Sequence, residues 1–319
     1  MCTAGLVLIS EDSLSYDVMS SADVAVRVLR KLENEDLRVL QVIETAMSKH
    51  EFVPKEQIAR FAELDLTRDT DFRLRRLSKL GLIFQIREAF TGYTLNFAGY
   101  DCLAINALVK GNVLEAFGKS LGVGKEADVF DALDPNGQRI AVKFHRLGRI
   151  SFRQTRRKRS YTTQRSASWL YQSRLAAEKE FQALKLLFPC KVAVPKPISQ
   201  NRHVVVMGMI EGTELANWKK LSKTEKILKE ILRNIRKAYL KAGIIHADLS
   251  EYNIILKPNK HILIIDWPQY IMREHPNARD LLRRDIQNIL HYFKRKHNLN
   301  VRLEESLEYA TGTRKTFIE

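Results

Sequence analysis

The chain has 319 residues, a length that predicts two or three compact units, and apolar residues make up 45% of it. Its 53 Lys and Arg against 37 Asp and Glu give a formal charge of +16, which favours a polyanionic partner such as nucleic acid, although a basic protein without one is the alternative. The three cysteines form no CxxC pair, so neither a zinc site nor a disulfide framework is indicated, and a cytoplasmic location is expected. No stretch approaches the roughly 20 apolar residues of a membrane span, and no membrane contact is expected.

The first hundred residues have the pattern of a tail followed by a small α+β domain. Residues 1–33 are assigned to an N-terminal tail. Residues 34–100 predict three helices and then a hairpin, because apolar residues recur at helical spacing from Leu37, Pro54 suits a helix start, and Gly81 suits a helix end. This order is typical of a winged helix-turn-helix whose third helix is the recognition helix. A small helical domain whose charges only face water is the alternative.

The rest of the chain predicts a connecting helix and a two-lobed α+β domain. Residues 101–118 are assigned to the helix, after which Val-rich and Ile-rich strands begin. Residues 119–211 form the predicted N-terminal lobe, with a basic, flexible loop at 146–168 and a helix at about 175–187. Residues 212–319 form a reduced C-terminal lobe.

A glycine-containing turn is expected between the first two strands of the N-terminal lobe. Gly122 and Gly124 allow the backbone to approach phosphates without a Cβ in the way, and Lys125 adds a cation at the tip. An ordinary hairpin turn explains two glycines equally well.

A lysine inside an apolar strand is a second signal. Lys143 lies nineteen residues past Gly124, in a strand where a buried ammonium must be paired unless the strand is at an edge. Kinases place such a lysine on the α- and β-phosphates of ATP and pair it with a glutamate of the next helix. We predict Glu180 as that partner in preference to the more outward Glu178.

The strongest signal lies between residues 244 and 268. Asp248 and Asn253 are five residues apart, and Asn253 and Asp266 are thirteen apart, which are the spacings of the kinase catalytic loop and its metal-binding aspartate. Asp248 is predicted to meet the attacking nucleophile. Asn253 and Asp266 are predicted to hold Mg²⁺, a cation that prefers oxygen ligands. Capped turns explain any one of the motifs, but not four in the right order.

Together these motifs resemble the Rio family of atypical kinases, second subtype. The resemblance covers roughly residues 34–300 and rests on the winged helix and on segments 122–126, 142–149, 151–153, 246–253 and 265–269. The family usually has Phe where Trp267 stands and often Gly at Ala247. The resemblance implies an α+β fold in which an N-terminal winged helix precedes a two-lobed, truncated protein-kinase-like domain. Asp285 lies in a later Leu-Leu-Arg-Arg-Asp helix, which is expected to brace the C-terminal lobe.

The same resemblance implies an ATP- and Mg²⁺-dependent serine/threonine kinase or ATPase that acts in maturation of the small ribosomal subunit, with Mn²⁺ as an alternative metal. The catalytic residues would be Asp248 and Asp266, and the metal ligands Asn253 and Asp266. The expected nucleotide contacts are Gly122, Val123, Gly124, Lys125, Glu126, Lys143, Glu180, Met207, Ile210 and Ser250. The expected partners are the precursor subunit and its rRNA, and the chain is expected to be a monomer.

The stretch from Arg146 to Arg165 is strongly basic, and no acidic residue occurs between Pro135 and Ala177. We expect it to be mobile when free and to contact RNA, with a solvated loop as the alternative. Two other functions stay open. A catalytically inactive RNA-binding scaffold is disfavoured by the retained kinase motifs. A winged-helix DNA-binding regulator is disfavoured because no dimerising heptads appear.

Overall fold

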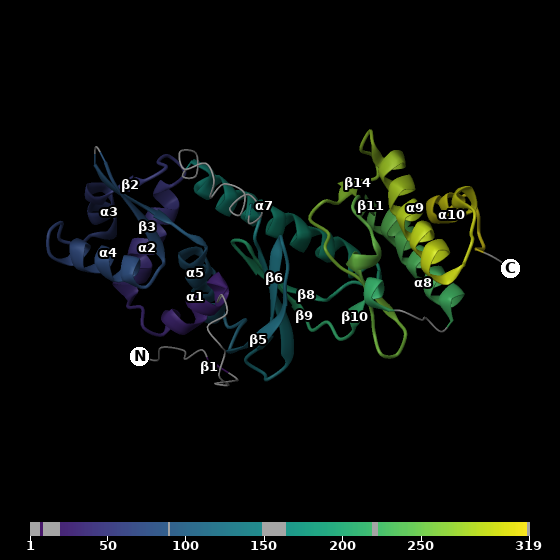
Figure 1. Ribbon diagram of the computed structural model, residues 1–319, viewed down its shortest axis with the longest axis horizontal. Coiled ribbons are helices and arrows are strands. Elements are labelled where there is room, and N and C mark those ends of the chain that lie inside the picture. The colour runs from purple at the N-terminus through teal and green to yellow at the C-terminus, as the bar shows by residue number, and fades with distance from the viewer. Residues whose placement is uncertain (1–6, 9–19, 89, 149–163, 219–222, 318–319) are drawn as a thin grey trace. The chain divides into compact units, whose positions relative to one another are not determined.

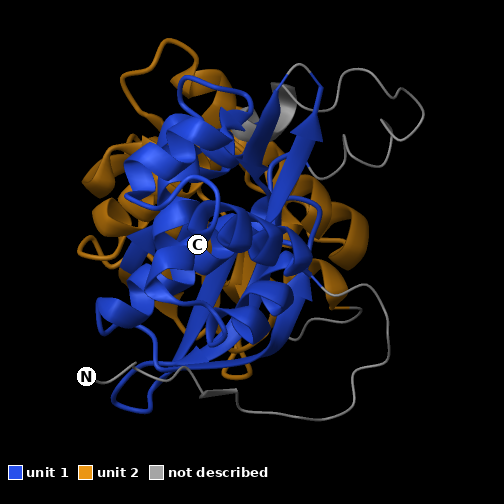
Figure 2. Cartoon of the chain, turned by 90° about the vertical axis from the view of Figure 1, so that its left-hand side faces the viewer, with its two compact units in different colours: residues 1–175, 199–205 blue, residues 176–198, 206–319 orange. Residues whose placement is uncertain are grey.

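The computed structural model describes residues 7–8, 20–88, 90–148, 164–218 and 223–317 (Figure 1). The chain divides into two compact units (Figure 2). The first contains residues 1–175 and 199–205, and the second contains residues 176–198 and 206–319. Within the described ranges, no helix is both long and apolar enough to cross a membrane.

The first unit begins with a helical domain that carries a small sheet. Its helices are α1 (Ser21–Leu29), α2 (Asn34–Ala46), α3 (Lys55–Ala62), α4 (Asp69–Lys79) and α5 (Phe97–Lys110). Its strands are β2 (Val53–Pro54), β3 (Ile83–Arg87) and β4 (Thr91–Leu95), which form an antiparallel sheet in the order β2-β4-β3. Leu40, Ile43 and Leu74 are fully buried between the helices. The predicted order of three helices and a hairpin is confirmed, and it is that of a winged helix-turn-helix.

Two predicted boundaries in this region were wrong. Helix α1 lies inside the predicted tail, where Ser20 and Asp23 form a capping box and Ala22 and Val26 are buried. Because α1 packs against α5, it belongs to the domain. Helix α5 begins and ends earlier than the predicted connecting helix, since the side chain of Asn96 caps its start and strand β5 has already begun at residue 116.

The first unit continues into a six-stranded sheet of order β1-β5-β6-β7-β9-β8. These strands are β1 (Val7–Leu8), β5 (Ala116–Val123), β6 (Ala127–Leu133), β7 (Arg139–His145), β8 (Pro197–Asn201) and β9 (Val204–Gly208). The rings of Phe117, Phe130 and Phe144 pack on one another with centroids 5.1 to 6.0 Å apart. Helix α7 (Gln164–Leu187) begins eleven residues before the expected start near 175. Residues 149–163 of the predicted basic loop lie outside the described residues.

Arg146 was predicted as the first cation of that loop, and this was wrong. Its side chain is 1% exposed and lies in a buried charge cluster. It donates two hydrogen bonds of 2.8 Å to the carboxylate of Asp101 on α5 and one of 3.1 Å to Asp128 on β6. Burial alone would raise the pKa of Asp101, but Arg146 and His203 outweigh it and hold that pKa below its usual value.

His203 completes the cluster as a neutral side chain. Its Nε2 lies 2.6 Å from Oδ1 of Asp101, and its ring stacks on Tyr100 at 4.5 Å. Its Nδ1 has no partner among the described residues, so a second proton there would be buried without an acceptor. Burial accordingly lowers the pKa of His203 to about 4. The cluster therefore joins the winged-helix domain to the sheet through ionised Asp101 and Arg146.

Among the described residues, the second unit contains the end of α7, several short strands and three further helices. Its strands are β10 (Thr213–Glu214), β11 (Ile244–Ile245), β12 (Ile254–Leu256), β13 (Ile262–Ile264) and β14 (Ile271–Met272), paired in the orders β10-β12-β13 and β11-β14. Its helices are α8 (Thr224–Lys237), α9 (Ala278–His297) and α10 (Leu303–Thr311), with a π-helical turn at Ala238–Ala242 and 3-10 turns at Leu215–Asn217 and Glu251–Asn253. Ile231, Ile286 and Phe293 are fully buried in its core. In the described chain, α9 and α10 are the helices that follow Asp266, which agrees with a reduced C-terminal lobe.

The buried cluster predicts a large loss of stability when its charge balance is broken. Asp101→Asn leaves the buried guanidinium of Arg146 without its bidentate partner, so the free energy of unfolding should fall by about 3–5 kcal/mol. The matched control is Asp131→Asn, because Asp131 pairs with Arg139 at 2.8 Å and the Arg139 side chain is 50% exposed. Its loss should be below about 1 kcal/mol. Urea unfolding of both variants checks this, and equal losses would show that the cluster is not a special source of stability.

Candidate active site

The predicted phosphate loop is an exposed turn in the first unit. Residues 121–126 are all exposed at the junction of β5 and β6, and the amide of Gly124 donates to the carbonyl of Ala127 at 2.8 Å. Gly122 has an ordinary negative φ, and a Cβ added there would meet nothing within 4 Å. The fold therefore does not require glycine at 122, and the predicted contact of this turn with phosphates stays a prediction. Val123, Lys125 and Glu126 lie on the same turn.

Lys143 lies on β7 between two fully buried residues, Val142 and Phe144, and is itself 8% exposed. A lysine in this position must be charge-paired or lose its proton, because burying an unpaired ammonium costs several kcal/mol. Glu180 on α7 is 2% exposed, whereas Glu178 is half-buried, as expected from their predicted roles. Since Lys143 belongs to the first unit and Glu180 to the second, their pairing stays a prediction.

The second unit holds the catalytic loop by its backbone. The carboxylate of Asp285 on α9 accepts hydrogen bonds from the amides of Ala247, at 2.8 Å, and Leu249, at 3.0 Å. Arg284 donates to the carbonyl of Ala247, and Asn288 donates to that of Leu249. The two residues that flank Asp248 are thus fixed, while the Asp248 side chain is exposed. The helix that carries Asp285 was predicted to brace the lobe, and through Asp285 it holds this loop. The motifs gave no signal for Arg284 and Asn288.

Asp285 is 1% exposed, and its burial raises the pKa of its carboxyl group, although the two amide bonds act in the opposite direction. Both oxygens accept a backbone N–H, so the ionised form is the one that makes the full set of bonds. Ala247 has a φ of 64°, in the left-handed region. This explains why glycine suits the position, since alanine there costs about 1–2 kcal/mol. The bonds to Asp285 and Arg284 hold that conformation.

Asn253 connects the catalytic loop to the segment that carries Asp266. Its Nδ2 donates to the carbonyl of Asp248 at 2.8 Å, which leaves the carboxamide oxygen as a possible ligand. Its own carbonyl accepts from the amide of Ile265 at 2.9 Å, and its amide donates to the carbonyl of Ser250 at 3.1 Å. Asp248, Asn253 and Asp266 are therefore brought to one place in the second unit, as the spacing predicted.

Asp266 follows β13 with a φ of 67°, and its carboxylate is half-buried. The turn is fixed on both sides: Trp267 is 2% exposed and donates to the carbonyl of Ile264, while His246 bonds the carbonyl of Ile265 at 3.0 Å. The His246 and Trp267 rings pack with centroids 4.5 Å apart. A non-glycine residue in this region is uncommon and is often found at functional sites.

The donor set suits Mg²⁺. A carboxylate and an amide oxygen that lie close together in the second unit fit a cation that completes its shell with water and phosphate oxygens. The described residues contain no group of three or more His, Cys, Asp and Glu that would form an all-protein cage. Met207 is buried on β9, while Ile210 and Ser250 are half-buried in the second unit. Their predicted nucleotide contacts stay predictions.

Comparison with known proteins identifies the family. The family model of the RIO domain matches residues 128–306, and that of the Rio2 N-terminal domain matches residues 29–111. The RIO-type serine/threonine-protein kinase Rio2 of Methanocaldococcus jannaschii is 43% identical over 278 residues, which are 83% of this chain and 100% of the relative. The serine/threonine-protein kinase RIO2 of Saccharomyces cerevisiae is 33% identical over 293 residues, which are 89% of this chain and 69% of the relative.

A solved structure shares the fold. It is the Rio2 kinase of Chaetomium thermophilum in a complex described as ADP/Mg²⁺-phosphoaspartate, with a TM-score of 0.78 and 32% identity over 89% of this chain and 88% of that one. The catalytic-loop geometry, the two family matches and the length of the shared sequence agree. The chain therefore belongs to the RIO kinases, in the Rio2 subtype, and is an atypical serine/threonine protein kinase.

Proposed function

We propose that this kinase transfers or hydrolyses the γ-phosphoryl group of Mg²⁺-ATP while it is bound to a precursor of the small ribosomal subunit. The observation that carries the chemical part is the fixed loop, in which Asp285 pins the backbone on both sides of Asp248 and Asn253 links that loop to Asp266. The related Chaetomium enzyme, described with ADP and Mg²⁺, supports the same pair of ligands for this chain.

Each residue then has a separate task. Asp248, exposed on its fixed loop, accepts the proton of the attacking hydroxyl. Asn253 and Asp266 would hold Mg²⁺, which neutralises charge on the phosphates when bound. Lys143, oriented by Glu180, would contact the α- and β-phosphates, while the turn at 122–126 covers them. Met207, Ile210 and Ser250 would line the nucleotide site.

The phosphoryl acceptor has two candidates. One is a hydroxyl, from water or a serine, deprotonated by Asp248. The other is the carboxylate of Asp266, which would attack the γ-phosphorus and form an acyl phosphate as ADP leaves. The phosphoaspartate in the Chaetomium complex supports the second route. The left-handed backbone at Asp266 also sets it apart from an ordinary strand end.

The two carboxylates should fail differently. Asp266→Asn removes a charge that faces the metal, so Mg²⁺-ATP binding should weaken and be partly rescued by more Mg²⁺. Asp248→Asn should bind Mg²⁺-ATP nearly normally and lose about 10²- to 10⁴-fold in rate if it acts as the general base. Nucleotide titrations at several Mg²⁺ concentrations, with single-turnover rates, check both expectations.

A metal-rescuable binding defect in Asp248→Asn but not in Asp266→Asn would reverse the assigned roles. The same samples separate the acceptors. Hydroxylamine-labile label from γ-labelled ATP on the wild type, absent from Asp266→Asn, supports the acyl phosphate, whereas label released only as inorganic phosphate from the start supports water.

The ribosomal part of the proposal rests on charge. The formal charge of +16 and the basic residues between 149 and 165 suit a large polyanion, although 149–163 lie outside the described residues. The DNA-binding alternative is weakened by α4. Arg73 and Arg76 of this helix pair with Glu33 at 2.6 and 2.5 Å and with Asp36 at 3.2 and 3.3 Å. The hydrogen bonds from Arg76 and Arg73 lower the pKa of Glu33. Because both arginines are paired with carboxylates of their own domain, they are less available to contact DNA phosphates.

Neutralising the basic stretch should weaken RNA binding and flatten its salt dependence. Replacing Arg156, Arg157, Lys158 and Arg159 with Gln should reduce the log–log slope by about 0.7 to 0.9 for each phosphate that the protein no longer neutralises. ATP hydrolysis without RNA should change little. The control replaces four exposed cations of the second unit, namely Arg279, Lys294, Lys296 and Arg302. Filter binding of small-subunit rRNA at several salt concentrations measures the slope for the loop variant and for the control variant. If the slope of the loop variant equals that of the wild type, the basic stretch does not contact RNA and is only a solvated tether.

A further inference from the structure

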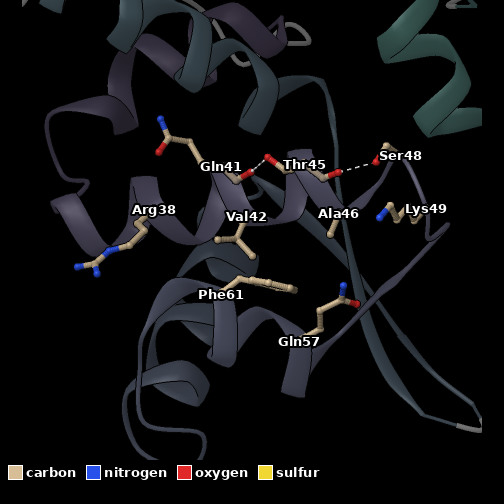
Figure 3. Close-up of a pocket in the computed structure, with 9 residues that line it drawn as sticks. All are labelled: Arg38, Gln41, Val42, Thr45, Ala46, Ser48, Lys49, Gln57 and Phe61. Atoms are coloured by element: carbon tan, nitrogen blue, oxygen red, sulfur yellow. Dashed lines mark hydrogen bonds between the residues drawn. The ribbon is translucent and has the colours of Figure 1, made fainter.

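The winged-helix domain carries a surface groove between α2 and α3, away from its core (Figure 3). The groove has a volume of about 320 Å³. Val42 and Ala46 of α2 and Phe61 of α3 form its apolar floor, and Phe61 is 55% exposed. Figure 3 shows Arg38 at one end of this floor and Lys49 at the other. A contiguous apolar floor between polar rims is the form of a binding groove.

Most residues that pack α2 and α3 into the core differ from those that form the floor of the groove. Helix α2 turns Leu37, Leu40 and Ile43 to the core, and helix α3 turns Ile58 and Ala62 inward. On α2 the groove-lining residues include a second stripe at positions 38, 42, 45 and 46, and Lys49 lies in the turn that follows the helix. Ala46 is buried and belongs to the core as well, but Val42 is half-buried and Phe61 is largely exposed, so these two side chains leave apolar surface at the groove.

The rim offers hydrogen bonds as well. The hydroxyls of Thr45 and Ser48 donate to carbonyls of α2, at 2.9 and 2.8 Å, so they are used within the helix (Figure 3). The carboxamides of Gln41 and Gln57 make no hydrogen bond in the described part of the chain. They can therefore donate to, and accept from, the polar edge of a bound peptide.

The charges at the rim of the groove are positive and favour a negatively charged partner. Arg38 and Lys49 are the charged residues of the lining, and no carboxylate of the described chain is among them. Arg38 lies 3.8 Å from Glu63 in a loose, exposed pair. Arg60 lies over the ring of Phe61, 5.6 Å from its centroid, and adds a third cation beside the floor. The surface is thus complementary to carboxylates around an apolar centre.

We propose that this groove binds an acidic amphipathic helix of a partner protein. On α2 the stripe extends eight residues, from Arg38 to Ala46, which is about 12 Å at a helical rise of 1.5 Å per residue and a little over two turns. A helix of that length places apolar side chains at i, i+4 and i+7 on the floor, with carboxylates near both cations. Nucleic acid fits less well, since the floor is apolar and two cations line it. The proposal does not depend on ATP turnover.

A displayed library of amphipathic peptides of about 14 residues, selected on the full chain, tests this inference. Enriched peptides should carry apolar residues at i, i+4 and i+7 and an excess of Asp and Glu. The best of them, synthesised and labelled, should bind Phe61→Ala at least about tenfold more weakly than the wild type. Lys49→Glu should also weaken binding, and higher salt should lower the affinity of the wild type.

Phe72→Ala is the matched control. Phe72 on α4 is 54% exposed and has Arg73 over its ring at 5.4 Å, as Phe61 has Arg60, but it lies outside the groove. Its affinity for the peptide should equal that of the wild type, and thermal unfolding should show both Phe variants folded. The proposal is overturned if no acidic amphipathic peptide is enriched or if the peptide binds Phe61→Ala normally. It is equally overturned if Phe61→Ala weakens binding of single-stranded RNA and leaves the peptide unaffected.

Discussion

The carboxylate of Asp285 and the two backbone amides that donate to it are the constraint on which the active site depends. These bonds fix the backbone of Ala247 and Leu249. The backbone of Asp248 between them is therefore restrained to one conformation, in which its side chain is exposed to solvent. The left-handed Ala247 would otherwise relax, because it is unfavourable for a residue with a Cβ. Asn253 then transmits the position of this loop to the Asp266 segment through one side-chain and one backbone hydrogen bond. A helix that follows this loop in the chain, α9, thus holds its geometry.

Several charges of the first unit are used for internal structure. Arg146 is enclosed by Asp101, Asp128 and the neutral His203, and it joins the winged-helix domain to the sheet that bears Lys143. Arg73 and Arg76 hold the recognition-type helix α4 to the start of α2. A basic composition is therefore a poor guide to which cations meet a polyanion. The exposed cations that remain on this domain include those beside the α2–α3 groove, where they border apolar surface.

The order of the elements, the motif spacings and the family resemblance were enough to predict the fold. The spacings also predicted that Asp248, Asn253 and Asp266 lie near one another, because these residues belong to two short motifs that are close in the sequence. The prediction failed where the deciding contact is long-range. Arg146 has the surroundings of a basic loop in the sequence, but its partner Asp101 is 45 residues away. Helix α1 could have been found from the Ser20 and Asp23 capping signature. The hydrogen bonds from Arg284 and Asn288 to the catalytic loop could not be predicted from the sequence, because their acceptors are backbone carbonyls, which every residue has.

Single-turnover phosphoryl transfer by Asp285→Asn tests this account most directly. The substitution keeps the shape but turns an N–H donor toward a backbone N–H, so one of the two amides loses its acceptor and the loop loses its fixed position. The rate should fall by about 10²-fold, with Mg²⁺-ATP affinity close to that of the wild type. Asp280→Asn, an exposed carboxylate on the same helix, is the control and should keep the wild-type rate. A wild-type rate in Asp285→Asn, with the protein folded, would contradict the claim that this carboxylate sets the catalytic geometry.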